Sequence, residues 1–321
     1  MLNKRLVVPT LVVVVAVAAA GVGWKLAIHK KVAGSVEYPM LVSTDIPTTV
    51  AAAPDGSVWF TIDFGDGVGL IRDGKMQRVP KAGRNVEPIG LGIDKDGAAW
   101  LTDPSKIAIL RITANGDVKS FSLGTPVARL ARLAVAPDGA VWFAESTAFS
   151  VTRLKDGKLD RHEFKSLRGG PYGVAVASDG TVWATLQSGN QLLRIAPTGE
   201  MTEHDLPTPS AAPTDVAVDP QGGVWIVEFS ANKIAHFADG KFTEYPLPKD
   251  KGAPSGLAIT SDGSVWFGVL RGAALGRLRS GEMTFHALPR PTARPYSLAA
   301  DPSGNVWYAD ISGYVGMVPA R

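Results

Sequence analysis

The sequence predicts an all-β protein built as a seven-bladed β-propeller, and three observations support this. Each of seven tryptophans follows a short apolar segment and a glycine-bearing turn, and helical periodicity is absent from the same region. Four short strands in a repeat of about 40–45 residues are typical of one propeller blade. The seven tryptophans recur at spacings of 41, 42, 41, 42, 41 and 41 residues, and they are Trp59, Trp100, Trp142, Trp183, Trp225, Trp266 and Trp307.

Each repeat predicts four strands in a fixed order. The first two are apolar runs on either side of an Asp-Gly turn, as in residues 174–183, because glycine supplies the positive φ that a tight hairpin needs. A third strand follows, for example at 191–195, and a second glycine turn leads to a fourth, for example at 242–248. We expect the recurrent tryptophan to be structural and to fill the space between neighbouring blades.

The last repeat holds only three candidate strands, at 297–300, 306–311 and 314–318. Residues 35–40 precede the first repeat and resemble the sequence of the fourth strand at 242–247. Pairing them with the last blade would close the ring and leave no exposed sheet edge. We therefore predict one propeller domain over residues 34–321, closed by its N-terminal strand.

Residues 1–33 form a separate segment that predicts membrane association. Lys4 and Arg5 precede an apolar run that extends to Trp24, and further lysines follow it. Such a segment is typical of a secretory signal peptide, and it is also long enough to cross a bilayer as one helix of roughly 20 residues. We expect one N-terminal hydrophobic helix, either cleaved as a signal peptide or retained as a signal-anchor. Either outcome predicts an extracytoplasmic protein, in the periplasm or at the cell surface.

Composition and charge exclude several classes of function. The chain has no cysteine, which excludes a disulfide framework, a thiolate metal site and a cysteine nucleophile. The net charge of +3 comes from residues 1–33, which carry five basic and no acidic residues, so residues 34–321 carry −2. Nucleic acid is not an expected partner, because it would need a basic face on the folded domain. We expect a monomer that binds a small molecule, a peptide or an envelope protein.

The repeat places polar residues at one mouth of the central channel. The start of each innermost strand and the end of each second strand lie at the open end of a hairpin, so both sets should ring that mouth. Rigid scaffolds present their binding residues in such places. We predict a ligand-binding site there, formed by Tyr172, Tyr296, Arg129, Arg132, Arg294, Asp215, Glu145, Glu228 and Asp310.

The carboxylates of this mouth have two interpretations. Clusters of oxygen ligands suit Mg²⁺ or Ca²⁺, and Glu87 with Asp103 is the candidate pair for such a metal. Carboxylates that alternate with arginines can also neutralise them as ion pairs around a water-filled channel. The sequence leaves both interpretations open.

Over about residues 35–321 the repeat resembles the virginiamycin B lyase family of seven-bladed propellers. The resemblance rests on residues 231–234, on the segment 242–248 and on the tripeptide Ala293-Arg294-Pro295. The resemblance implies a Mg²⁺-dependent elimination that linearises a cyclic depsipeptide antibiotic. It also implies a site with a histidine after a proline. The next blade then supplies a Glu-Pro-His triplet and an acidic residue sixteen positions after that glutamate.

The sequence departs from this family pattern at the histidines. Tyr296 follows the Ala-Arg-Pro tripeptide where the family has histidine, and Ile89 follows the corresponding Glu-Pro pair. Asp103 lies sixteen residues after Glu87, so the resemblance assigns these two acidic positions to the metal, although in a different blade from the family's. A tyrosine is a poor base at neutral pH, because its ordinary pKa is about 10.

Two functions therefore remain open. The first is a non-catalytic module that binds a small ligand, a peptide or a partner protein at the channel mouth. The second is a divalent-metal-dependent enzyme, either a lyase or a hydrolase similar to related propellers that open lactones. In it Glu87 and Asp103, or Glu145 and Glu228, would hold the metal. A metal-bound water would then replace the histidine base, because a divalent ion lowers the pKa of its water.

Overall fold

The computed structural model describes residues 34–80, 88–124, 129–164 and 169–320. These residues form 28 β-strands and no helix. None of them forms a helix that could cross a bilayer. The predicted N-terminal hydrophobic helix falls on residues 1–33, which lie outside the described residues.

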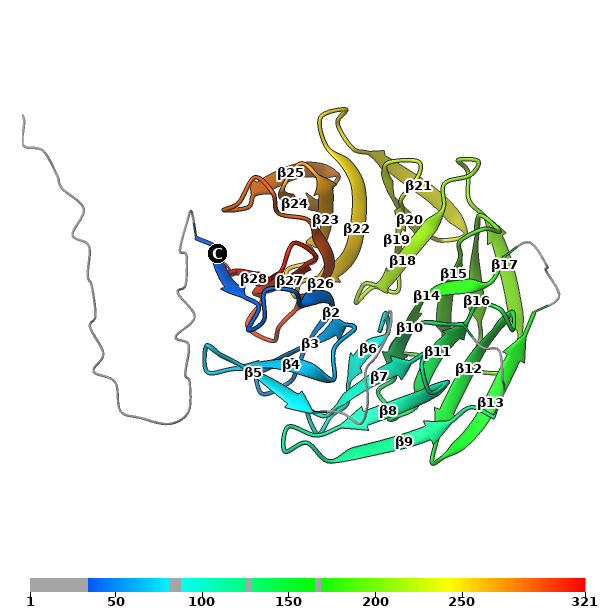
Figure 1. The fold of residues 1–321 in the computed structure, drawn as a ribbon. Helices are drawn as coiled ribbons and strands as arrows, with labels where there is room; N and C mark the ends of the chain where they lie inside the picture. Colours follow the sequence, from blue (N-terminus) through cyan, green and yellow to red (C-terminus); the bar gives the residue numbers. More distant parts are fainter. Residues whose placement is uncertain (1–33, 81–87, 125–128, 165–168, 321) are drawn as a thin grey trace, which may run out of the picture.

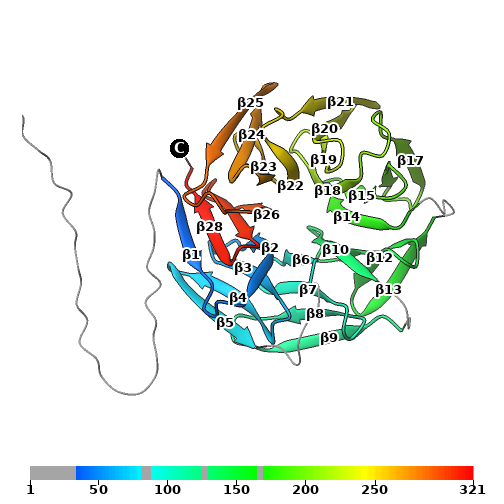
Figure 2. The same ribbon diagram turned by 45° about the horizontal axis from the view of Figure 1, so that its top comes forward.

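The strands form seven four-stranded antiparallel sheets around a central axis, which confirms the predicted propeller (Figures 1 and 2). Six of the sheets take four consecutive strands each. Blades 1 to 3 are β2 (Ile46–Ala52), β3 (Val58–Asp63), β4 (Gly67–Arg72) and β5 (Lys75–Pro80); β6 (Leu91–Ile93), β7 (Ala99–Asp103), β8 (Ala108–Ile112) and β9 (Val118–Ser122); and β10 (Leu130–Val135), β11 (Val141–Glu145), β12 (Ser150–Lys155) and β13 (Lys158–Glu163).

The remaining blades follow the same order from the axis outward. Blades 4 to 7 are β14 (Pro171–Val176), β15 (Val182–Leu186), β16 (Gln191–Ile195) and β17 (Met201–Asp205); β18 (Pro213–Val218), β19 (Val224–Glu228), β20 (Lys233–Ala238) and β21 (Lys241–Pro246); β22 (Gly252–Ile259), β23 (Val265–Arg271), β24 (Ala274–Arg279) and β25 (Glu282–Ala287); and β26 (Pro295–Ala300), β27 (Val306–Asp310) and β28 (Tyr314–Val318) with β1 (Val36–Pro39).

The ring closes as the sequence predicts. β1 pairs antiparallel with β28, from Val36 opposite Met317 to Pro39 opposite Tyr314. The last blade therefore has the strand order β1-β28-β27-β26, and its outermost strand comes from the other end of the propeller sequence. Figure 2 shows β1 lying along the outside of β28.

The hairpin turns and the tryptophans take the roles that the repeat predicts. Gly180 and Gly263 lie in the first turns of their blades with φ values of 86° and 77°, which favour glycine over other residues. Trp59 is fully buried, packs with residues of blade 2, and donates its indole N–H to the carbonyl of Gly97 at 3.2 Å. Trp183 packs in the same way against blade 5. The tryptophans therefore join neighbouring blades.

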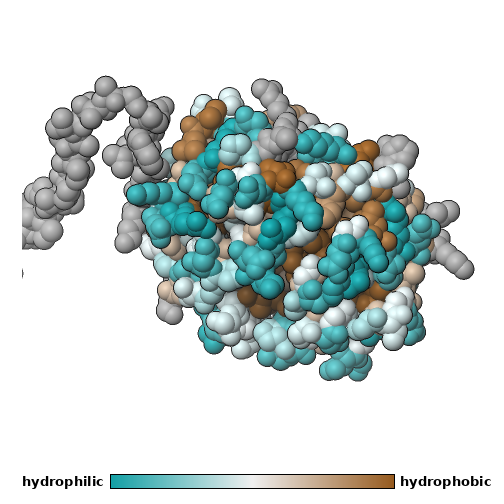
Figure 3. Space-filling model, turned by 90° about the horizontal axis from the view of Figure 1, so that it is seen from below, coloured by the Kyte–Doolittle hydropathy of each residue, from teal (hydrophilic) through white to brown (hydrophobic). Residues whose placement is uncertain are grey.

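Each innermost strand runs along the wall of the channel from one face of the ring to the other. We call the face where these strands begin the upper mouth and the face where they end the lower mouth. Between the two mouths lies a layer of seven leucines and valines, each 4–7% exposed, which we call the median ring. Its members are Val50, Leu91, Leu133, Val174, Val216, Leu257 and Leu298. They line one small space at the axis together with polar residues, among them Arg132 and Asp215. Hydrophilic side chains cover much of the surface seen in Figure 3, with small apolar areas between them.

A buried polar network fastens the closing strand. Glu37 of β1 is 1% exposed and accepts hydrogen bonds from the guanidinium of Arg290, at 2.8 and 3.2 Å, and from the hydroxyl of Tyr308, at 2.9 Å. Arg290 also pairs with the fully buried Asp310 and lies over the ring of Tyr314, 3.5 Å from its centroid. Burial and the nearby Glu37 carboxylate raise the pKa of Tyr308 above its usual value, so its hydroxyl keeps its proton. We call these five residues the closure network.

Removing the Glu37 carboxylate should weaken ring closure. We expect Glu37→Ala to lower the free energy of unfolding by about 3 kcal/mol, because Arg290 and Tyr308 would lose a buried partner. Urea denaturation followed by tryptophan fluorescence measures this difference. Glu203→Gln, on the exposed face of the outer strand β17, is the control and should change stability by less than about 0.5 kcal/mol. Equal stabilities for the two variants would contradict a fastening role for the network.

Candidate binding site at the upper channel mouth

Four predicted residues converge at the upper mouth from four different blades. They are Arg132 of β10, Tyr172 of β14, Asp215 of β18 and Tyr296 of β26, and together we call them the upper site. The register of each of these strands shifts near its start, between Leu130 and Leu133 in the case of β10. Such a bulge re-aims side chains. Two neighbouring side chains, which regular alternation along a strand would place on opposite faces of the blade, can therefore both face the channel.

The upper site contains an ion pair and a pair of phenols. Arg132 Nε lies 3.4 Å from Asp215 Oδ1, and the two side chains are 11% and 12% exposed. Asp215 Oδ2 accepts a hydrogen bond of 2.8 Å from the backbone N–H of Leu257 in the next blade. The hydroxyls of Tyr172 and Tyr296 lie 3.3 Å apart, although the two residues are 124 positions apart in the chain. A cavity of about 110 Å³ separates the ion pair from the median ring.

The electrostatics of the upper site favour binding over proton transfer. Burial is the largest single effect on Arg132 and lowers its pKa, but the Asp215 carboxylate, Tyr172 and Tyr296 together outweigh it and raise that pKa, so the guanidinium stays charged. Burial, reinforced by Tyr296, raises the pKa of Tyr172 above its usual value, so this phenol stays protonated. Arg132 Nε has no partner of hydrogen-bond geometry within the described part of the chain. The site therefore offers a charged donor and hydroxyl groups to a polar ligand.

The predicted carboxylates of the second strands occupy a different place. Asp103, Glu145, Glu228 and Asp310 are all 0% exposed, so they lie inside their blades and do not line the channel. The physical reason is that only the innermost strand of a blade faces the axis, while the second strand lies behind it. Glu145, for example, accepts a hydrogen bond of 3.2 Å from Arg161 Nε of β13 in its own blade. In this arrangement a ligand in the channel would not contact these four carboxylates.

The other predicted site residues lie at the rim or outside the structure's described part. Arg129 and Arg294 are exposed residues directly before β10 and β26. Their backbone N–H groups donate to Thr147 and to Asp310, at 2.9 Å in both cases. Glu87 falls in residues 81–87, outside the described residues.

The described residues do not fit a Mg²⁺ or Ca²⁺ ion. No group of three or more His, Asp or Glu side chains among them is arranged to hold a metal. Asp103 has one carboxylate oxygen without a hydrogen-bond partner, and its other oxygen accepts from the backbone N–H of Lys106 at 3.2 Å. A single buried carboxylate is not a site for these ions, because they take six or more oxygen ligands. The pair of Glu87 and Asp103 stays a prediction.

The four described histidines lie on the third and fourth strands of their blades, away from the axis. His162 and His204 lie near the rings of Trp142 and Trp183, with centroids 5.2 and 6.2 Å apart. His236 stacks on Trp225 at 4.1 Å. The His286 ring is 2.8 Å from the hydroxyl of Ser35. None of these four histidines belongs to the upper site.

The sequence analysis names Glu228 as a candidate ligand, but it does not identify it as an acid with a shifted pKa. Burial, with a smaller effect of the nearby Glu244 carboxylate, raises the pKa of Glu228 to about 7. Glu244 pairs with Lys233 and accepts a hydrogen bond of 2.9 Å from the hydroxyl of Thr208. No pattern in the sequence predicts that Glu228 and Glu244 lie close together, because this depends on the register between β19, β20 and β21.

Comparison with known proteins matches one family. The family model described as "Virginiamycin B lyase family" matches residues 28–190. The curated virginiamycin B lyase of Nocardia farcinica is 36% identical over 156 residues, which are 48% of this chain and 53% of that protein. The chain thus matches about half the length of this curated relative.

Two solved structures of virginiamycin B lyase from Staphylococcus aureus share the fold. A catalytically inactive histidine-to-alanine variant with quinupristin superposes with a TM-score of 0.84, at 24% identity, over 89% of this chain and 99% of that chain. The selenomethionine-substituted protein also gives a TM-score of 0.84, at 25% identity, with the same coverage.

The buried ion pair of the upper site predicts a non-additive mutant pair. Asp215→Asn should lower the free energy of unfolding by about 3 kcal/mol, because it leaves Arg132 charged, buried and unpaired. The double variant Arg132→Met with Asp215→Asn should recover most of that loss, since no buried charge remains and Asn can still accept from the Leu257 N–H. Urea denaturation of the wild type, the two single variants and the double variant measures the coupling. Simple addition of the two single effects would contradict the pairing.

The raised pKa of Glu228 predicts a pH-dependent stability. Between the unfolded pKa near 4.5 and the folded pKa of about 7, the folded state keeps a proton that the unfolded state loses. The wild-type protein should therefore lose stability as the pH rises through this window. Glu228→Gln lacks this titration, so its stability relative to wild type should increase by about 2 kcal/mol from pH 5 to pH 8.

Urea denaturation at several pH values measures this effect. Glu163→Gln, at an exposed position of β13, is the matched control and should track the wild-type pH dependence. A pH-independent difference between Glu228→Gln and the wild type would contradict the assignment.

Proposed function

Because the chain belongs to the virginiamycin B lyase family, we propose that it is a non-catalytic relative that binds a small molecule or a peptide at the upper channel mouth. We also propose that the N-terminal segment directs it out of the cytoplasm and holds it at a membrane. The observation that carries the binding proposal is the upper site itself. Four blades contribute a buried Arg132–Asp215 pair and two tyrosine hydroxyls to one point on the axis.

The chemistry of the upper site favours a ligand with carbonyl or other acceptor oxygens. The charged Arg132 and the protonated Tyr172 are donors, and their burial strengthens each hydrogen bond by excluding water. The aromatic rings of Tyr172 and Tyr296 add flat apolar surface at the same place. A peptide or depsipeptide backbone, which alternates carbonyl groups with apolar side chains, suits this combination.

Three observations favour binding without turnover. Tyr296 occupies the position at which the family pattern has a histidine. The four described histidines lie on third and fourth strands, too far from the axis to act on a ligand at the upper site. The residues that the structure describes do not fit a divalent ion. If such an ion were held by residues such as Glu87, it would supply Lewis-acid chemistry, and the protein would be the alternative, a metal-dependent lyase or hydrolase.

Quinupristin is a suitable probe, since a solved relative from Staphylococcus aureus contains it. We expect the purified full-length protein to bind quinupristin in calorimetry and to leave it cyclic after incubation with Mg²⁺, as judged by liquid chromatography and mass spectrometry. Tyr172→Phe and Tyr296→Phe should each weaken binding about tenfold, the effect of losing roughly 1.4 kcal/mol of hydrogen bonding. Tyr245→Phe, on the outer strand β21, is the control and should bind as the wild type does.

The alternatives give different results. Mg²⁺-dependent conversion of quinupristin, abolished by Asp103→Ala, would support the enzyme and overturn the binding proposal. Unchanged affinity in both tyrosine variants would place the site elsewhere. Absence of binding at about 1 mM quinupristin, a limit equivalent to some −4 kcal/mol, would exclude a depsipeptide ligand.

A further inference from the structure

The lower mouth of the channel is an apolar cavity that the upper site does not use. The last residue of each innermost strand lines this cavity or a smaller one beside it, and these seven residues, which we call the lower cup, are all half-buried and apolar. The cavity has a volume of about 530 Å³ and adjoins another of about 260 Å³, with which it shares Ile259 and Ser261. The lower cup consists of Ala52, Ile93, Val135, Val176, Val218, Ile259 and Ala300.

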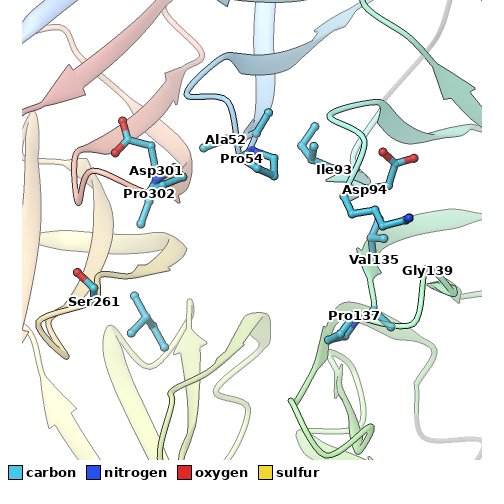
Figure 4. Close-up of a pocket in the computed structure, with 15 residues that line it drawn as sticks. Ala52, Pro54, Ile93, Asp94, Val135, Pro137, Gly139, Ser261, Asp301 and Pro302 are labelled. Carbon is cyan, nitrogen blue, oxygen red and sulfur yellow. The ribbon is translucent and has the colours of Figure 1, made fainter.

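Three aspartates around the lower cup are already hydrogen-bonded within their own blades. Asp94, Asp219 and Asp301 each accept a hydrogen bond of 2.9 Å from the indole N–H of their blade's tryptophan. Other rim positions are prolines, such as Pro54 and Pro137, which have no N–H to satisfy. Figure 4 shows Asp94, Asp301, Pro54 and Pro137 around an open centre. The seven strand-end residues themselves offer no polar side chain, so the lower cup favours an apolar ligand, because a polar group held against them would lose its hydration without compensation.

The lower cup is separate from the upper site. The median ring lies between them, and the cavity of the lower cup shares no lining residue with the small cavity below Arg132. At the rim, the side chain of Lys95 is 87% exposed, with only a long contact of 3.9 Å to Asp96. An apolar chain that entered end-on would thus meet an apolar wall, while an anionic group at its outer end would meet Lys95.

The N-terminal segment joins the propeller at the same face. Val36 lies opposite Met317 at the end of β28, next to Val318, which lies opposite Val306. Val306 in turn lies opposite Ala300 of the lower cup. β1 therefore begins at the lower face. The apolar run extends to Trp24, so the eleven residues 25–35 lie between it and β1, a reach of at most about 40 Å at full extension.

We propose that the lower cup binds the acyl chain of a membrane lipid. The inference rests on the membrane attachment proposed above, which would keep the lower face close to the bilayer. The lipid enters the lower cup by its methyl end, and Lys95 lies near its headgroup. The upper site, at the opposite face, then points away from the membrane and stays accessible to its own ligand.

Photolabelling of the full-length protein in cells tests this inference. Cells take up a diazirine-bearing palmitic acid into their lipids, and ultraviolet light links it to neighbouring residues. Mass spectrometry of the purified protein then maps the links. We expect them at two places, on residues 1–33, which report membrane attachment, and on the strand ends of the lower cup.

Two variants and one control make the result specific. Val218→Asp adds a carboxylate to the lower cup, and Ala300→Phe fills it while keeping it apolar. Each should reduce labelling of the lower cup at least about tenfold and leave the label on residues 1–33 unchanged. Val118→Asp, at an exposed position of the outer strand β9, should keep both labels. Near-ultraviolet circular dichroism of the tryptophans verifies that each variant is folded.

Each possible labelling pattern supports or overturns either the lipid inference or the membrane attachment. Label on residues 1–33 but not on the lower cup overturns the inference and leaves membrane attachment intact. Label on the lower cup alone supports the inference and overturns attachment. Label at neither place overturns both. Label on the lower cup that persists in both cup variants shows non-specific reaction and also overturns the inference.

Discussion

The pairing of β1 with β28 is the constraint on which the rest of the structure depends. A propeller has no single core, since each blade packs only against its two neighbours, and an open ring would expose two blade faces and two sheet edges. Here the closing strand brings Glu37 into a buried network with Arg290 and Asp310, so closure combines backbone hydrogen bonds with charge pairing. The position of every channel residue follows from this closed geometry.

The closed ring gives the two ends of one channel different chemistry. The innermost strands begin with bulges that direct Arg132, Asp215 and the two tyrosines to the axis, and they end in small or branched apolar residues. Between these ends, the median ring keeps the polar and the apolar regions apart. The two faces of one repeat thus differ in chemistry, because the innermost strands begin with residues that vary between blades and end in residues that are apolar in every blade.

Family membership and the local chemistry of this chain point in different directions. The chain shares its fold with solved virginiamycin B lyases, yet none of its four described histidines belongs to the upper site, and burial keeps the Tyr172 phenol protonated. A fold tolerates a change of side chain at positions such as Tyr172 and Tyr296, because tryptophans, turns and backbone strand pairing hold the blades together. Retention of the scaffold therefore says little about retention of the reaction.

The sequence by itself determined the number of blades, their four-strand order and the closing strand. Each of these depends on local patterns, namely the tryptophan spacing, the Asp-Gly turns and the likeness of residues 35–40 to a fourth strand. It also identified Tyr172, Tyr296, Arg132 and Asp215 as residues near one mouth. It could not show that the two phenols meet, since the contact joins residues 124 positions apart across the ring.

Tertiary structure alone decided which candidate side chains face the channel. Asp103, Glu145, Glu228 and Asp310 follow the same repeat as the tyrosines, but they lie on second strands and are fully buried. The repeat gives the strand and the height of each residue, but not whether its side chain reaches the channel or is enclosed by its neighbours. Enclosure depends on bulges, on side-chain pairing and on closure of the ring, which are properties of the assembled blades.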